Sequence, residues 1–137
     1  MDARVLDEVR HYWFGDAPSA TEPPPKERQD MWFRPTEAID SHVRDTFSRH
    51  LDAARAFPWK LAELSAARQV ALVVLLDQFP RHIWRKSGEA FAYDAKALEI
   101  ARALVAAGWR RFPHRNAMLG RESTPEELEF LKGGRGF

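Results

Sequence analysis

The feature that most constrains the fold is an uninterrupted apolar run at residues 70–76, with the sequence VALVVLL. A helix that is apolar all round must have neighbours on every side. The valines would also suit a buried strand, but the polar, periodic residues 60–69 that lead into the run favour a helix. We therefore predict a fully buried helix around residues 62–79. Pro80 should end it, because proline has no N–H to donate and disfavours helical geometry in the residue before it.

The remainder of the chain is also predicted to be helical. Apolar residues recur at helical spacing in three further segments, and a short fourth segment ends in two aromatic residues. The predicted segments are 2–14, which ends at Gly15, then 27–33, 36–56 and 95–107. In the helix over 36–56 we expect Ile39, Val43, Phe47 and Leu51 to face the core and Asp40, Arg44, Asp45 and Arg49 to face water.

Local signals mark the ends of these elements. Residues 16–25 hold four prolines and predict an extended loop. Asp94 is suited to be the N-cap of the helix over 95–107. Residues 124–127 (TPEE) form a capping box with proline at the first helical position, which predicts a last helix. No alternating runs separated by hairpin turns occur, so we predict one all-α domain of antiparallel helical hairpins over residues 1–137.

Composition excludes several classes of protein. The chain has no cysteine, which rules out disulfides, thiolate catalysis and cysteine-based metal sites. Its net charge of +1 does not suit a dedicated nucleic-acid binder. No segment has the length or apolarity of a membrane span, and we expect a cytoplasmic protein. The five histidines lack metal-ligand spacing and there is no glycine-rich nucleotide loop, so we expect neither a metal nor a cofactor.

The strongest candidate site follows the buried helix directly. Asp77 and Gln78 come at its end, and Arg81 is the nearest candidate partner for the carboxylate. Burying an unpaired carboxylate would cost on the order of several kcal/mol in lost hydration, or else raise its pKa. These three side chains either line a polar pocket or simply secure the end of the helix, and their spacing alone favours the second interpretation.

Two other groups could contribute to a site. Asp94 is either a cap or a site carboxylate. Residues 110–116 (RRFPHRN) could bind a phosphate or carboxylate through their arginines and histidine, or lie in solvent paired with nearby glutamates. Trp32 could form the wall of a ligand groove, although core packing is the commoner role of such a tryptophan. The candidate ligand-binding residues are thus Asp77, Gln78, Arg81, Asp94, His114, Arg115, Asn116 and Trp32.

Several motifs together resemble the DUF924 family. They are Tyr12-Trp13-Phe14, Trp32-Phe33 with Asp40, the segments 75–81 (LLDQFPR) and 90–94 (AFAYD), and the ending 112–127 (FPHRNAMLGRESTPEE). The resemblance extends from about residue 5 to the C-terminus. It implies a bacterial, all-α protein similar to tetratricopeptide-repeat hairpins, whose biochemical role is uncharacterised. It also singles out seven of the candidate residues: Asp77, Gln78, Arg81, Asp94, His114, Arg115 and Asn116. The resemblance raises the weight of the site interpretation for Asp77 and Arg81.

The sequence departs from the family pattern in two places. Residue 82 is histidine where the family typically has asparagine. A further helical hairpin, which the family has after the helix over 95–107, is missing at about 108–111. Its absence should expose apolar surface on that helix, and we expect a homodimer to cover this surface.

Two functions remain open at this point. The first is binding of a small anionic ligand or peptide in a polar pocket near Asp77 and Arg81, with Asp77 or His114 as the acid–base group if the protein is an enzyme. The second is a non-catalytic protein-interaction scaffold of the tetratricopeptide-repeat type.

Overall fold

The computed structural model describes residues 1–15 and 25–106, and these residues form helices connected by short turns, with no strand among them. The α-helices are α1 (Arg4–Phe14), α2 (Lys26–Phe33), α3 (Glu37–Phe47), α4 (Leu51–Ala56), α5 (Ala66–Ile83) and α6 (Asp94–Ala106). Three short 3₁₀ segments connect them: η1 (Ser48–His50), η2 (Leu61–Glu63) and η3 (Gly88–Phe91). The predicted all-α fold class is confirmed.

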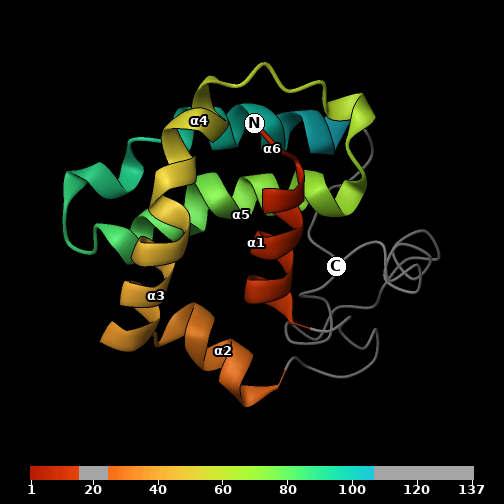
Figure 1. Ribbon diagram of the computed structural model, residues 1–137. Coiled ribbons are helices and arrows are strands. Elements are labelled where there is room, and N and C mark those ends of the chain that lie inside the picture. Colours follow the sequence, from red (N-terminus) through yellow and green to blue (C-terminus); the bar gives the residue numbers. More distant parts are fainter. Residues whose placement is uncertain (16–24, 107–137) are drawn as a thin grey trace.

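Helix α5 is the centre of the molecule. Helices α1, α3, α4 and α6 and the segment η3 all pack on it. In Figure 1, α1 and α3 run in opposite directions and cross α5, while α6 returns antiparallel to it. The apolar run 70–76 is buried except at Val73, which is half-buried. This arrangement explains why that run is apolar on almost every side.

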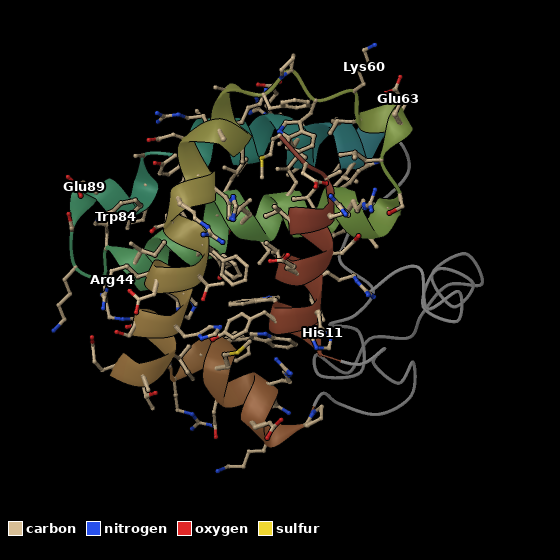
Figure 2. All side chains as sticks on the ribbon, in the orientation of Figure 1. His11, Arg44, Lys60, Glu63, Trp84 and Glu89 are labelled. Carbon is tan, nitrogen blue, oxygen red and sulfur yellow. The ribbon has the colours of Figure 1, made fainter. Side chains whose placement is uncertain are left out.

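Aromatic side chains fill the space between α1, α3 and α5. The ring of Phe79 is fully buried and lies 4.8 Å from Phe47, 5.7 Å from Trp13 and 6.2 Å from Tyr12, measured between ring centroids. Figure 2 shows the side chains crowded between these helices, whereas Lys60, Glu63 and Glu89 extend outward from the molecule. The first, third and fifth helices therefore share one core, although they are distant in sequence.

Pro80 does not end the central helix, contrary to the prediction. It lies inside α5, which continues to Ile83, and the amide of Trp84 still donates to the carbonyl of Pro80 over 2.9 Å. A proline inside a helix deprives the carbonyl four residues earlier of its backbone donor. The side chain of Arg81 donates to the neighbouring Asp77 carbonyl. Helix α5 also begins at Ala66, later than predicted, after η2 and a Ser65 cap that accepts from the amide of Arg68.

The helix predicted over 36–56 is interrupted. Thr36 caps α3, which ends at Phe47, and the 3₁₀ turn η1 separates it from α4. The prediction that Asp40 faces water is also wrong, because this residue is buried with Val43 and Phe47 on the face that packs on α5. Asp40, Val43 and Phe47 have the i, i+3, i+7 spacing of one helix face.

The start of α6 differs slightly from the prediction. Asp94 is the first residue of the helix, and the carbonyl of Tyr93 before it accepts from the amide of Ala97. Tyr93 thus occupies the cap position that was predicted for Asp94. Three other predictions concern residues that lie, except for Pro25, outside the described ranges: the loop over 16–25, the missing hairpin at about 108–111 and the capping box at 124–127.

Candidate functional site

The two carboxylates predicted for the site converge on one guanidinium group. Asp77 and Arg81 are one turn apart on α5, and Arg81 Nη1 lies 3.1 Å from Asp77 Oδ1. Both Arg81 terminal nitrogens also donate to Asp94, over 3.1 Å and 3.0 Å. Such forked pairing is the strongest geometry between arginine and a carboxylate. It links the end of α5 to the start of α6.

Two further groups complete this cluster. The amide of Gln78 donates to Asp77 Oδ2, and the Arg81 guanidinium lies over the ring of Phe91, 5.1 Å from its centroid. The side chains of Asp77, Arg81 and Asp94 are each about one-third exposed. Solvent at that level screens the ion pairs, so we expect the cluster to contribute little to stability. Its three charged groups sum to one negative charge.

A pocket of about 420 Å³ lies beside this cluster, between α5 and α6, and is open to solvent. Its walls are formed by apolar side chains and by the two carboxylates. The lining residues are Val73, Asp77, Asp94, Ala95, Ala97, Leu98 and Ala101. An apolar pocket with a few converging polar groups is the usual form of a small-molecule site.

The structure brings Asp77, Gln78, Arg81 and Asp94 together, and it places Trp32 elsewhere. The Trp32 indole stacks on Trp13, with centroids 6.0 Å apart, and donates to the Trp13 carbonyl over 2.9 Å. Trp32 thus belongs to the aromatic packing around α1 and does not line the pocket. The remaining candidates, His114, Arg115 and Asn116, lie outside the described residues.

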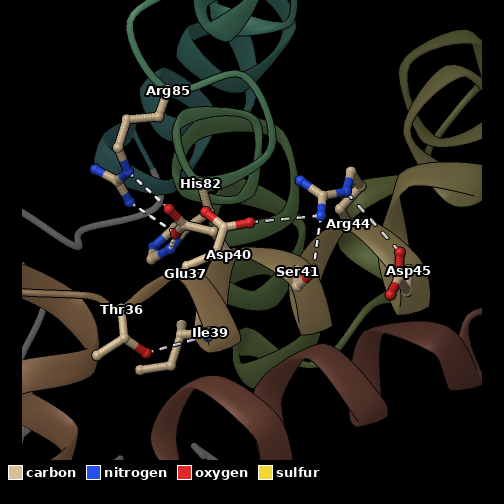
Figure 3. A network of polar contacts seen from close by, with 9 residues as sticks. All are labelled: Thr36, Glu37, Ile39, Asp40, Ser41, Arg44, Asp45, His82 and Arg85. Carbon is tan, nitrogen blue, oxygen red and sulfur yellow. Dashed lines mark hydrogen bonds and ion pairs between the residues drawn. The ribbon is translucent and has the colours of Figure 1, made fainter.

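Sequence reasoning missed a second polar cluster at the contact between α3 and α5. Arg85 donates to both oxygens of Asp40 over 2.8 Å, and His82 Nδ1 lies 2.9 Å from Asp40 Oδ1. Figure 3 shows His82, in the last turn of α5, and Arg85, in the turn that follows the helix, reaching the same carboxylate. Asp40 and His82 are both buried, and the edge of the His82 ring meets Trp13. The sequence signal that could have revealed this cluster is the position of Asp40 on the same helix face as Val43 and Phe47.

Burial and ion pairing set the protonation states of this second cluster. Burial opposes the charge of Asp40, but the bonds from Arg85 and His82 outweigh it and lower the pKa of the carboxyl group. Burial also lowers the pKa of His82, and the nearby Asp40 carboxylate only partly offsets that effect. At neutral pH, Asp40 is therefore ionised and His82 is neutral. Because a carboxylate only accepts, the His82 proton is on Nδ1.

In residues 1–15 and 25–106, no group of three or more histidine or acidic side chains is arranged to hold a metal ion. Across the same ranges, no helix combines the length and apolarity needed to cross a membrane.

The described residues therefore define an all-α protein with an open, acidic pocket between two antiparallel helices. The chain belongs to the DUF924 family, described as bacterial proteins of unknown function, whose family model matches residues 9–110 and also residues 107–135. No curated protein and no solved structure matches the chain. The two matched segments meet at residues 107–110, directly after α6.

Proposed function

We propose that this protein binds a small molecule or a peptide side chain in the pocket between α5 and α6. The observation that carries the proposal is the position of Asp77 and Asp94 together on a pocket otherwise lined by apolar side chains. The partial exposure of both carboxylates leaves them within reach of a ligand, while Arg81 holds them in place.

The charge of the cluster favours a ligand group that is positive or donates hydrogen bonds. The sequence led us to expect an anion held by Arg81, but two carboxylates already occupy this guanidinium. With one net negative charge beside the pocket, a cation gains favourable electrostatics and an anion is repelled. An anionic ligand would have to rely on His114, Arg115 and Asn116 outside the described residues. The proposed ligand therefore has a basic group on a short apolar stem.

Thermal denaturation with a matched pair of probes tests this proposal. Butylguanidinium and butyrate have unbranched apolar stems of nearly equal length and opposite charges. We expect butylguanidinium to raise the Tm of the protein, because a ligand that binds only the folded state stabilises it. The variant Asp77→Asn should reduce that increase, and the control Asp45→Asn, an exposed carboxylate on α3, should leave it unchanged. Stabilisation by butyrate alone would refute the cationic ligand and favour the anionic one.

A protein-interaction scaffold of the tetratricopeptide-repeat type is the second candidate. The antiparallel pair α5 and α6 supports it (Figure 1), as do the exposed apolar side chains of Phe91, Leu98 and Val105 beside the pocket. The meeting of two family segments at residues 107–110 supports the proposal that a helical hairpin is missing there. If neither probe changes the Tm, the scaffold becomes the better proposal.

A further inference from the structure

The outer face of α6 carries an apolar stripe next to the pocket. Leu98 is 50% exposed and Val105 is 55% exposed, and Phe91, just before the helix, is 58% exposed. Of the described residues, these three and Phe33 on α2 are the exposed large hydrophobic side chains. Leu98 and Val105 are seven residues apart, which is two turns of α6, and Phe91 is the last residue of η3, just before the helix begins.

This stripe is separate from the face of α6 that packs on α5. The buried face consists of Ala97, Ile100 and Leu104. Asp94, Leu98, Ala101 and Val105, by contrast, follow one another at spacings of four, three and four residues. That is the spacing of the contact positions in a coiled coil. Helix α6 therefore has a second seam suited to packing against another helix.

We propose that this outer face of α6 docks on the same face of a second copy of the chain, with the two α6 helices antiparallel. The two-fold axis passes close to Leu98, and Arg102 of each copy reaches the carboxylates of the other. The proposal rests on the proposed function, since it identifies Arg102 of a second copy as the basic group that the Asp77 and Asp94 pocket receives.

Charge complementarity selects this partner and this orientation. Arg102 is exposed and makes no ion pair within the described part of the chain. Asp94 and Arg102 lie four residues on either side of Leu98, about 6 Å along the helix axis. A two-fold rotation at Leu98 brings Arg102 of one copy level with Asp94 of the other. A parallel arrangement would place like charges opposite each other instead.

The exposed apolar side chains at α6 are compatible with the same two-fold symmetry. Val105 lies seven residues beyond Leu98 along α6, about 10 Å, so the antiparallel arrangement brings it past the first residue of the other copy's α6, the end of the helix that the exposed Phe91 of η3 precedes. A two-fold interface must be self-complementary in this way. Helix α6 is only about 20 Å long, and the contact it can make is smaller than the roughly 800 Å² per partner of a standard stable interface. The dimer should therefore dissociate in the micromolar range.

Sedimentation velocity of the full chain between about 1 and 200 µM tests the dimer. We expect the wild type to dimerise with concentration. Leu98→Glu and Arg102→Glu should each raise the dissociation constant by about tenfold or more. The control Lys26→Glu, on α2, makes the same charge change as Arg102→Glu and should leave the dissociation constant unchanged. Circular dichroism establishes that each variant is folded. A wild type that stays monomeric, or a dimer that neither α6 variant weakens, would overturn the proposal.

Titration with butylguanidinium separates this proposal from the proposed function. A monomeric wild type that still binds the probe would disprove the dimer and leave the ligand pocket intact. In the opposite case, the wild type dimerises through Arg102 and the Arg102→Glu monomer, in which every pocket-lining residue is unchanged, fails to bind the probe. The dimer would then be confirmed, and the pocket would bind only Arg102 of the second copy.

Discussion

Replacing His82 with asparagine tests the protonation states of the buried cluster. Burial lowers the pKa of His82 in the folded protein below its ordinary value of 6.5. As the pH falls through 6.5, the unfolded chain takes up a proton at this residue and the folded protein does not. The contribution to stability is therefore present above that pH and is lost below it.

The size of this effect follows from the titration of a single histidine in the unfolded chain. Between pH 6.5 and about 5.5, a group that titrates only in the unfolded state lowers the free energy of unfolding by about 1 kcal/mol. The carboxyl of Asp40, whose pKa is also lowered, affects stability only at more acidic pH, below its ordinary value of 3.8. Asparagine retains a donor for Asp40 but does not titrate. Between pH 6.5 and about 5.5, the free energy of unfolding of His82→Asn should therefore fall by about 1 kcal/mol less than that of the wild type.

Urea denaturation at several pH values between about 7.5 and 5.5 measures the difference. The control is His50→Asn, because burial and then the charge of Arg49 also lower the pKa of His50. His50 is less buried than His82, so this variant should remove a smaller part of the pH dependence. If His82→Asn and the wild type lose equal free energy as the pH falls, the argument that His82 is neutral in the folded protein is wrong.

Two further predictions concern the core and the end of α1. Phe79→Ala should lower the free energy of unfolding by about 4 kcal/mol, because Phe79 is fully buried among aromatic rings. The control Phe33→Ala, at an exposed position, should lower it by less than about 1 kcal/mol in the same denaturation experiment. Gly15 has φ of +67°, and a Cβ there would lie 2.8 Å from the guanidinium of Arg28. Gly15→Ala should cost about 1–3 kcal/mol, whereas Gly88→Ala, where a Cβ meets nothing within 4 Å, should cost less; equal costs would contradict this account.

Much of the local structure could be predicted because its causes are local. The first helix and its end at Gly15 follow from periodicity and from a residue that tolerates positive φ. The central helix follows from the apolar run 70–76. The interruption at η1 and the passage of α5 through Pro80 could not be predicted, since packing on neighbouring helices overrides local preference there.

The candidate site was predicted only in part, for the same reason. The sequence indicated Arg81 as the nearest partner of Asp77, but the two residues are one turn apart on a helix only because α5 continues through Pro80. Their contact with Asp94 depends on the return of α6 along α5. That contact gives Arg81 two carboxylates and changes the expected charge of the ligand.

The amino-acid sequence by itself determined the helical class of this protein, its family and the helix that forms its centre, because periodicity and motifs are properties of neighbouring residues. Tertiary structure alone decided which charges meet. Asp40 joins His82 and Arg85 across more than forty residues, and this pairing exists only because α3 crosses α5. Exposed apolar surface on α6 was expected from the sequence, but only packing decided that Leu98 and Val105 are the side chains left exposed on this helix.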